Sequence, residues 1–372
     1  MSPDVIVIGA GAIGSSVAYS LTKAGARVML LDRGEVGAQA TQASAGMLIP
    51  QSESAGPGPF TDLALESVRL FGALSEELRE RTGMDIGYRA TALLRVAFDE
   101  EEEHDLRVRR AWQVRAGIAV SWLDAASATE VEPGLHPEVR AALFYPNDHQ
   151  VNAVVLARAL VRAAIDLGMV LQERAPVDSL VIEGDRVVGV QTAGVVVRAE
   201  EVVIATGAWS ASWAAALRTP IPVRPVRGQI LALEVRGTSL RNVVFSQAGY
   251  LVSKPDGLTY VGATEEEAGF DARPTAAGIA GLLALVPRLA PTLTTATFSR
   301  AWAGLRPGTP DRLPLLGRVP GWQGISLATG HFRNGILLAP VTGVLIADLL
   351  RHERPRMPLE AFDPARFVMR AA

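Results

Sequence analysis

The chain begins with a pattern of apolar and small residues that predicts a strand, a glycine turn, a helix and a second strand. Residues 5–8 form a continuous apolar run, as expected for a strand covered on both faces. Apolar positions then recur at helical spacing through Val17 and Leu21, and Gly25 ends the helix. Residues 28–31 are again apolar, so the chain is predicted to open with a βαβ unit.

The rest of the chain alternates between strand and helix patterns. Periodicity and turn signals predict a helix over 61–81, a strand over 92–96, a helix starting in the acidic run 99–105, a helix over 150–168 and a hairpin over 177–203. Residues 221–300 fit alternating strands, proline-rich turns and one helix. The apolar stretch 335–350 is interrupted by Pro340 and is short for a membrane span, so a buried helix is predicted there.

Composition narrows the class of protein. A chain of 372 residues suits two lobes that share a large core. A net charge of −3, without a Lys/Arg block interleaved with aromatics, argues against nucleic-acid or membrane partners and favours small, weakly charged substrates. The absence of cysteine excludes disulfides, thiolate catalysis and a cysteine-linked cofactor, and it permits a cytoplasmic location, which we expect. The five histidines are scattered without carboxylate spacing, so no metal site is predicted.

The glycine turn carries the most specific local motif. Gly9, Gly11 and Gly14 form GxGxxG between the first strand and the helix: the first permits the tight turn, the second lets backbone approach a pyrophosphate, and the third lets helix and strand pack closely. Asp32 ends the second strand, 32 − 14 = 18 residues after Gly14, where a carboxylate can bind an adenosine ribose. Adjacent Arg33 would suit a 2′-phosphate, but Asp32 would repel it. NAD or FAD is therefore preferred, and a glycine turn without a ligand is the alternative.

Two further segments favour FAD over NAD. The stretch 34–50 supplies small residues around Ser44, Ala45 and Gly46, which would let backbone approach a flat ring system closely. The strand in "VVIATGAWS" ends in Thr206 and Gly207, which again permits a close approach to a dinucleotide. Each segment alone is also compatible with an ordinary turn.

The motif "GHFRNG" at 330–335 precedes the predicted buried helix. A helix start rich in glycine and cationic side chains can hold an anion. The sequence therefore predicts that a negatively charged group lies near this turn.

Five segments together carry a family resemblance: the βαβ unit, "QASAGML", "ATGAWS", "AGLRPGTPDRLPLLG" and "GHFRNGILLAP". The chain resembles the FAD-dependent D-amino acid oxidase superfamily over essentially its whole length, and most of all the glycine oxidases of thiamine biosynthesis. The resemblance implies non-covalent FAD and an α/β fold, with a Rossmann-like, glutathione reductase-type FAD-binding lobe and a smaller mixed α+β substrate lobe. It implies an FAD lobe formed by 1–84, 146–214 and 301–372, and a substrate lobe formed by 85–145 and 215–300.

The resemblance also implies which residues contact the cofactor. In such enzymes the helix after "GHFRNG" points at the pyrimidine end of the flavin, which becomes anionic on reduction, and a helix dipole contributes roughly 0.3–2 kcal/mol toward a nearby anion. Arg333 would add positive charge there, although a surface arginine paired with a carboxylate is the alternative. The expected contacts are Gly9, Gly11, Gly14, Asp32, Arg33, Ser44, Ala45, Gly46, Met47, Val177, Thr206, Gly207, Gly330, His331, Arg333, Asn334, Gly335 and Ile336.

For the substrate, the resemblance implies that Arg306 anchors the carboxylate, because its planar fork matches a carboxylate. Tyr250 would be a second carboxylate contact, although packing is the alternative, and the carbonyl of Gly304 would accept from the amine. His331 is expected to have a polar or backbone-orienting role, because hydride transfer from a neutral amine needs no side-chain base.

Two positions depart from the glycine oxidase pattern, which has histidine where this chain has Ala248 and methionine where it has Glu265. The pocket wall therefore differs, which leaves room for larger or basic D-amino acids.

The expected reaction is oxidative deamination. Arg306 and Tyr250 would align the substrate Cα–H with flavin N5 for hydride transfer, oxygen would be reduced to hydrogen peroxide, and the imine would hydrolyse or pass to a thiazole-forming partner enzyme. A homo-oligomer is expected. The alternatives are a D-amino acid or sarcosine oxidase or dehydrogenase, the latter passing electrons to a quinone, an NAD-dependent dehydrogenase, and an interaction protein that delivers an unstable imine.

Overall fold

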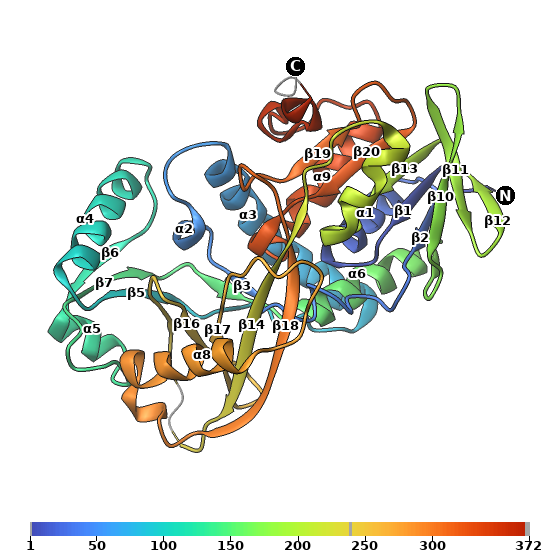
Figure 1. The fold of residues 1–372 in the computed structure, drawn as a ribbon. Helices are drawn as coiled ribbons and strands as arrows, with labels where there is room; N and C mark the ends of the chain where they lie inside the picture. The colour runs from blue at the N-terminus through green and yellow to red at the C-terminus, as the bar shows by residue number, and fades with distance from the viewer. Residues whose placement is uncertain (1, 238–239, 369–372) are drawn as a thin grey trace.

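Two large β-sheets organise the chain, of which the computed structural model describes residues 2–237 and 240–368 (Figure 1). The ends of the expected FAD lobe, residue 1 and 369–372, and residues 238–239 of the expected substrate lobe lie outside the described residues. The first sheet has six strands in the order β19 (Leu315–Arg318), β20 (Ile325–Thr329), β13 (Glu201–Ile204), β1 (Val5–Ile8), β2 (Val28–Leu31) and β9 (Val170–Gln172).

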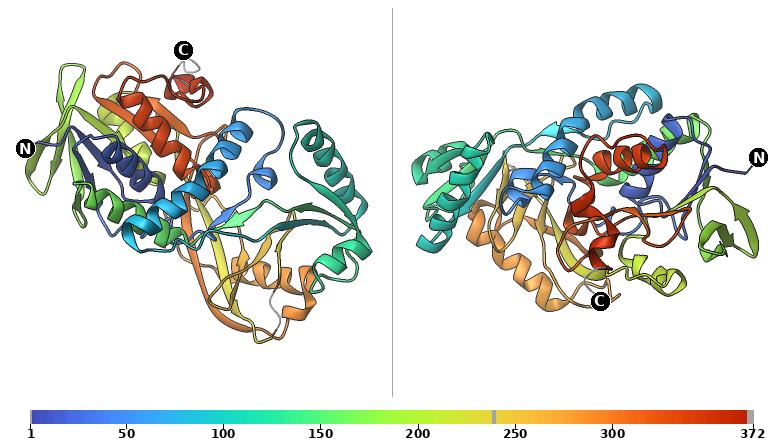
Figure 2. Two further views of the ribbon diagram at one scale, coloured as in Figure 1. Left: turned by 180° about the vertical axis from the view of Figure 1, so that it is seen from behind. Right: turned by 90° about the horizontal axis from the view of Figure 1, so that it is seen from above.

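The six-stranded sheet is covered on both faces. Strand β1 pairs in parallel with β2 and β13, and its residues alternate: Val5 and Val7 pack toward helices, whereas Ile6 and Ile8 pack toward a small antiparallel sheet. The helices are α1 (Ala12–Lys23), α3 (Pro59–Thr82), α6 (Ala153–Asp166) and α9 (Ala339–Leu350), and the small sheet is β10 (Val177–Glu183), β11 (Arg186–Thr192) and β12 (Val195–Arg198) (Figure 2). The continuous apolar run of β1 therefore follows from burial on two sides.

The second sheet has eight strands. Their order is β18 (Thr297–Gly308), β14 (Arg224–Glu234), β17 (Leu258–Gly262), β16 (Tyr250–Ser253), β15 (Val243–Phe245), β5 (Leu93–Ala97), β7 (Ala141–Tyr145) and β6 (Ser121–Asp124). One face packs on α8 (Ala276–Leu289), with Leu231, Leu251 and Val261 facing this helix. The other face carries Tyr250 and Val252 and contacts Ala45 and Ile49 of the N-terminal segment. On this second face, the eight-stranded sheet therefore packs against the N-terminal segment that follows β2.

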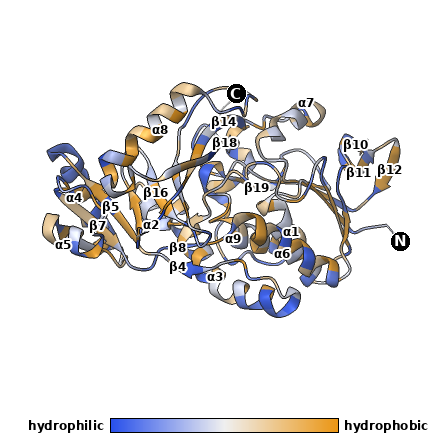
Figure 3. Cartoon of the chain, turned by 90° about the horizontal axis from the view of Figure 1, so that it is seen from below, coloured by the Kyte–Doolittle hydropathy of each residue, from blue (hydrophilic) through white to orange (hydrophobic). Residues whose placement is uncertain are grey.

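Shorter elements link these sheets. A third small sheet has the order β3 (Met47–Leu48), β8 (His149–Gln150) and β4 (Arg89–Ala90), and the remaining helices are α2 (Pro50–Glu53), α4 (Glu100–Arg115), α5 (Ala125–Val131) and α7 (Ala214–Leu217). Helix α4 is largely hydrophilic, whereas β5 and β7, which it contacts, are largely hydrophobic (Figure 3). Among the described residues, no helix is long and apolar enough to cross a membrane.

The predicted α/β fold class is confirmed, and most predicted elements lie within a few residues of the observed ones. Asp99 caps α4, as the acidic run indicated, because its side chain accepts from the Glu102 N–H at 2.8 Å. Two expectations are corrected. The predicted hairpin at 177–203 comprises β10, β11 and β12, because Ala193 and Gly194 form a second tight turn with positive φ before the chain enters β13.

The buried helix predicted over 335–350 begins only at Ala339. Residues 332–334 form a 3₁₀ turn, and the Leu338 N–H donates to the Asn334 carbonyl at 2.8 Å before α9 starts. Pro340 accounts for the later start, because proline has no N–H and is tolerated only in the first turn of a helix.

Gly9 and Gly14 allow α1 to pack against the end of β1. Gly9 has φ +107°, and a Cβ there would lie 2.5 Å from the Ala205 carbonyl oxygen. A Cβ at Gly14 would overlap the carbonyl oxygen of Gly9, so the first turn of α1 can approach the strand only without a side chain at that position. The close packing of α1 on β1 therefore requires glycine at both of these positions of the motif.

We expect Gly14→Ala to lower the free energy of unfolding by about 1–3 kcal/mol, because the added methyl group meets backbone that cannot give way. Urea denaturation measures the loss. Gly281→Ala is the matched control, since Gly281 lies on an exposed part of α8 with no atom near its Cβ position, and alanine there should leave stability unchanged or raise it by up to about 1 kcal/mol. Equal stabilities for the two variants would contradict this packing account.

Candidate active site

A cavity of about 1180 Å³ extends from the β1–α1 turn to the eight-stranded sheet. It is larger than the roughly 300–1,000 Å³ that ordinary small-ligand pockets occupy. Of the predicted cofactor and substrate residues, all except Gly14 and Gly330 line it. Gly14 lies in the first turn of α1 against the Gly9 carbonyl, and Gly330 has φ +76° and turns the chain beside Thr309. The fold therefore brings together segments that are far apart in the sequence.

The glycine turn leaves the start of α1 open toward this cavity. Gly11 is the N-terminal cap residue and has no side chain to cap the helix, and Thr41 Oγ1, 3.5 Å from a Cβ at Gly11, accepts from the Ala12 N–H at 3.0 Å. The first turn carries no acidic residue, so the positive end of the helix dipole is not neutralised. An anion such as a pyrophosphate fits this position.

Asp32 is fixed at the end of β2 beside the turn. Its Oδ2 accepts from the Ala10 N–H at 2.6 Å, and its Oδ1 accepts from the Gly34 N–H at 2.7 Å. A carboxylate has about four lone-pair sites, so two remain for the hydroxyls of a ribose. Next to it, the Arg33 guanidinium lies 3.9 Å from the centroid of the Trp209 ring, which forms a flat wall of the cavity.

The segment Ser44–Met47 is held against the eight-stranded sheet by a buried lysine that the sequence did not assign. Lys254 Nζ donates to the Ala45 carbonyl at 2.6 Å and to Gln150 Oε1 at 2.7 Å. Burial lowers the pKa of Lys254 to about 8. Gly46, with φ +71°, approaches the Val151 carbonyl so closely that no side chain would fit. These contacts fix a backbone surface that a ring system could lie against.

His331 lies at the other end of the cavity and is buried. Its Nε2 is 3.0 Å from Thr342 Oγ1, and its Nδ1 has no hydrogen-bond partner among the described residues. Burial lowers the pKa of His331 to about 3, so the ring is neutral near pH 7. Its imidazole is therefore a neutral polar group, which fits the expected role.

Arg333 lines the cavity in an ion pair with Glu53 at 2.7 Å. Glu53 raises the pKa of Arg333. The alternative interpretation, an exposed arginine paired with a carboxylate, describes the observed contact, and both partners also line the cavity. Glu53, which no motif singled out, therefore offsets the positive charge that was expected at this end.

Arg306 presents a guanidinium without a counter-charge. Its Nη1 donates to the Thr264 carbonyl at 2.9 Å and to the Arg227 carbonyl at 3.4 Å. None of the ion pairs among residues 2–237 and 240–368 includes Arg306. Burial lowers the pKa of Arg306, although the group remains protonated at neutral pH. This wall of the cavity is therefore suited to a carboxylate.

Tyr250 lines the same wall and is only 8% exposed. Burial raises the pKa of Tyr250 to about 12, so its hydroxyl stays protonated and can donate a hydrogen bond. No hydrogen bond of this hydroxyl to another described residue is present. Tyr250 and Arg306 thus offer two kinds of donor to one anion.

Three further residues shape the substrate end. Gly304 lines the cavity where a side chain would overlap the Ala43 methyl group, so the space between β18 and the N-terminal segment is narrow. Ala248 and Glu265 also line the cavity, and Glu265 pairs with exposed Arg312 at 2.8 Å. Among the residues that the structure describes, no cluster of three or more His, Asp or Glu side chains could hold a metal ion.

The arrangement of a Rossmann-like sheet, an open helix start and a long cavity that ends at a second sheet defines an FAD-binding oxidoreductase of the two-lobed type. The chain belongs to the DAO family of FAD dependent oxidoreductases, whose sequence model matches residues 4–349. The family resemblance and the FAD cofactor predicted from the motifs are thereby confirmed.

Similar proteins of known type cover nearly the full chain. It is 39% identical to a glycine oxidase of Geobacillus kaustophilus over 367 residues, which are 98% of this chain and 97% of that protein. The crystal structure of glycine oxidase from Geobacillus kaustophilus superposes on this chain with a TM-score of 0.94 at 38% identity. The superposition covers 98% of each chain. A bifunctional protein ThiO/ThiG of Nostoc sp. is 37% identical over this whole chain, which matches 56% of that longer protein.

We expect a pH effect on stability that depends on His331. The folded pKa of about 3 lies below the value of 6.5 for an ordinary histidine, so the unfolded chain binds a proton first as the pH falls. The His331 contribution to stability is therefore lost below about pH 6.5, with a slope of at most about 1.4 kcal/mol per pH unit. Urea denaturation of the flavin-loaded protein between pH 5 and 8 measures it.

His331→Gln should flatten this profile, because glutamine keeps a polar group near Thr342 but does not titrate. The matched control His104→Gln, on the exposed side of α4, should keep the wild-type profile. A wild-type slope in His331→Gln would contradict the assignment of a neutral, buried ring.

Proposed function

We propose that this protein oxidises the C–N bond of glycine and other small amino acids, including D-amino acids and the secondary amine sarcosine. For glycine the balanced reaction consumes one oxygen and one water and yields glyoxylate, ammonia and hydrogen peroxide. The observation that carries the proposal is the Arg306 guanidinium, which lies in the cavity wall beside Tyr250 and has no acidic partner among the described residues. The 39% identity to a glycine oxidase supports the same reaction.

Bound FAD would accept the hydride and pass both electrons to oxygen. The chain's own residues bind and orient the substrate: Arg306 and Tyr250 hold the carboxylate, and the Gly304 carbonyl accepts from the amine. No side-chain base is needed, because entry into the desolvated cavity favours the neutral amine. His331 is a weak proton acceptor, since burial lowers its pKa to about 3, and its ring is hydrogen-bonded to Thr342. Arg333 and Glu53 close this end of the cavity as a neutral pair.

A broader D-amino acid oxidase or dehydrogenase is the second candidate. Ala248 and Glu265 both line the cavity: Ala248 leaves space in the wall of the substrate end, and Glu265 brings a carboxylate that is paired with exposed Arg312. These two residues favour side chains longer than that of glycine, cationic ones included. A dehydrogenase would deliver its electrons to a quinone in place of oxygen.

We also propose the domain bounds, a partner enzyme, the oligomeric state and the cellular location. The FAD lobe would comprise 1–84, 146–214 and 301–372 and the substrate lobe 85–145 and 215–300, with β18 crossing the boundary at 301 as part of the eight-stranded sheet. The similarity to a protein named ThiO/ThiG supports a partner enzyme that uses the imine to form a thiazole. We further propose a homo-oligomer in the cytoplasm; the lack of cysteine is compatible with a reducing compartment.

Turnover in air tests the function directly. We expect glycine, sarcosine or D-alanine to yield hydrogen peroxide and the matching 2-oxo acid in equal amounts, measured by a coupled peroxidase assay and by chromatography of the keto acid. Keto acid formed only when a soluble quinone is added would establish the dehydrogenase alternative. Absence of keto acid with every acceptor would contradict both candidates.

Arg306→Leu should raise the KM for glycine by about 10²-fold or more, because the substrate carboxylate would be buried without its charged partner. Steady-state kinetics measure the change, and the flavin absorbance reports that the cofactor is still bound. Arg300→Leu is the matched control, since Arg300 lies on the same strand but is exposed. Unchanged saturation by glycine in Arg306→Leu would remove Arg306 from the site.

Glu265→Gln should lower kcat/KM for D-lysine relative to its neutral analogue D-norleucine by about two- to fivefold, as expected for a partly exposed charge pair. The ratio of the two substrates in one preparation cancels any change in enzyme concentration. Glu267→Gln is the control, because Glu267 pairs with Arg224 at 3.1 Å and does not line the cavity. The same ratio in both variants would show that Glu265 does not select the side chain.

A further inference from the structure

We propose that Gly228 and Gly262 are positioning residues for the substrate carboxylate. Because these two glycines carry no side chain, the guanidinium of Arg306 and the phenol of Tyr250 can pack flat against the sheet and converge above β14 and β17. This inference rests on the proposed role of Arg306 and Tyr250 as the carboxylate contacts.

The register of the eight-stranded sheet places these residues on one face. Gly304 of β18 pairs with Gly228 of β14, and two residues away Trp302 pairs with Ile230, which pairs with Gly262 of β17. Gly262 in turn pairs with Tyr250 of β16. Directly paired residues of antiparallel strands point to the same face, and positions two apart share that face. Arg306, Gly228, Gly262 and Tyr250 therefore all face the cavity, and α8 covers the opposite face.

Both functional side chains lean over a glycine of the neighbouring strand. A Cβ at Gly228 would overlap the guanidinium carbon and both terminal nitrogens of Arg306. A Cβ at Gly262 would lie 2.5 Å from Tyr250 Oη and 2.6 Å from its Cζ. Since β14 and β17 are adjacent, the two side chains approach each other from the outer strands β18 and β16. The two glycines thus create the space in which the donors meet.

Backbone conformation does not explain why glycine occurs at these two positions. Gly228 and Gly262 have no left-handed φ, in contrast to Gly249, where φ is +156°. A residue with a side chain could adopt the backbone at either position. What the site requires there is the missing Cβ.

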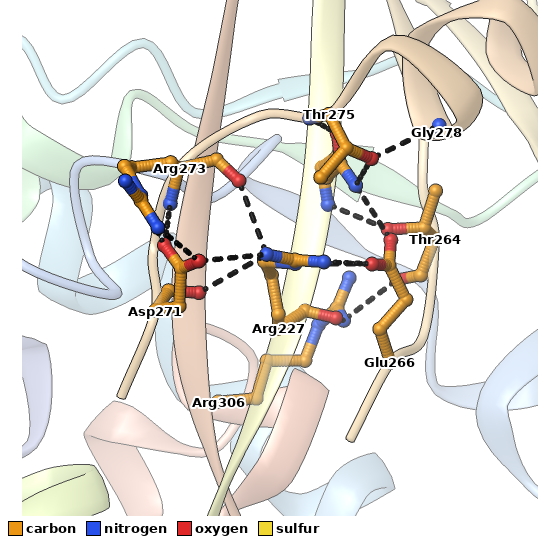
Figure 4. A network of polar contacts seen from close by, with 9 residues as sticks. Arg227, Thr264, Glu266, Asp271, Arg273, Thr275, Gly278 and Arg306 are labelled. Atoms are coloured by element: carbon orange, nitrogen blue, oxygen red, sulfur yellow. Dashed lines mark hydrogen bonds and ion pairs between the residues drawn. The ribbon is translucent and has the colours of Figure 1, made fainter. Parts of the chain in front are cut away.

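A polar network on the other side of the sheet fixes the carbonyls that hold Arg306. Arg227 forms an ion pair with Glu266, and the backbones of these two residues exchange hydrogen bonds of 2.9 and 3.0 Å (Figure 4). Gln229 donates from Nε2 to Glu266 Oε1 at 2.7 Å, and its backbone N–H donates to Thr264 Oγ1 at 2.9 Å. The Thr264 carbonyl then accepts from Arg306 at 2.9 Å. The two carbonyls under the guanidinium therefore belong to backbone that several hydrogen bonds hold in place.

This geometry separates an effect on the site from an effect on folding. The atoms that an alanine methyl at 228 would meet are the far end of a flexible side chain, not backbone. The Gly228→Ala variant should therefore still fold, with the Arg306 guanidinium displaced from its position above β14. Carboxylate binding should be lost while flavin binding is kept.

The test uses the flavin-loaded protein and acetate, the carboxylate part of glycine without the amine. Binding is followed by the change in flavin absorbance and, independently, by competition against glycine. We expect Gly228→Ala to raise the Kd for acetate by about tenfold or more, and Gly262→Ala to raise it in the same direction. Gly281→Ala in α8, outside the cavity, is the matched control and should bind acetate like the wild type.

A double-variant cycle identifies the route of the effect. In the Arg306→Leu background, adding Gly228→Ala should cause no further loss of acetate binding, because the side chain that it displaces is already absent. Should Gly228→Ala fail to load flavin, the double variant should load it again, since the overlap is removed.

Equal acetate affinity in the wild type and Gly228→Ala would overturn the inference and leave the proposed function intact. An additive loss in the double variant, or failure of that variant to recover flavin binding, would also overturn it. A wild type that binds no acetate would instead contradict the carboxylate anchor, and with it the proposed function.

Discussion

The physical constraint on which the site depends is the desolvation of the Arg306 charge. A partly buried guanidinium without an ion-pair partner is unfavourable, and the neutral carbonyl groups of Thr264 and Arg227 reduce that cost. A bound carboxylate would complete the pair. The eight-stranded sheet, its two cavity-facing glycines and the network behind it can all be understood as a support that keeps this charge in place.

The remaining charges of the cavity follow a different arrangement at each end. At the β1–α1 turn, a helix start without an acidic residue in its first turn faces the position expected for a pyrophosphate, and Asp32 lies beside it with free lone pairs. At the substrate end, Arg333 is neutralised by Glu53 and His331 is kept uncharged by burial. Arg306 has no ion-pair partner among the described residues where the substrate would lie, which makes the proposed catalysis one of positioning rather than of proton transfer.

The sequence was most informative where a structure depends on local residues. The βαβ unit with Gly9, Gly14 and Asp32 could be predicted because strand period, turn chemistry and helix spacing all lie within a short stretch. The start of α9 was predicted too early, although Pro340 carried the signal, because the apolar run continued through the turn. Arg306 and Tyr250 came from a family resemblance, since a lone arginine or tyrosine on a strand has no local signature.

Other parts of the site could not be predicted because they depend on long-range contacts. Glu53 and Arg333 are 280 positions apart in the chain, and Lys254 reaches Ala45 across 209. Gly228 and Gly262 lie in strand patterns where glycine ordinarily indicates a bulge or a weak strand. Their function depends on which side chain leans over them, and this is set by sheet register. Such pairs become visible only in the folded structure.

The central claim is that FAD and a carboxylate-anchored amine meet in this cavity, and the visible spectrum of the purified protein under anaerobic conditions tests it most directly. The account predicts an oxidised flavin band that bleaches on addition of glycine, sarcosine or D-alanine, with the fastest substrate defining the subclass. A flavin band that none of these amines bleaches would contradict the substrate site described for Arg306 and Tyr250, and a colourless protein that takes up no added FAD would contradict the cofactor assignment as well.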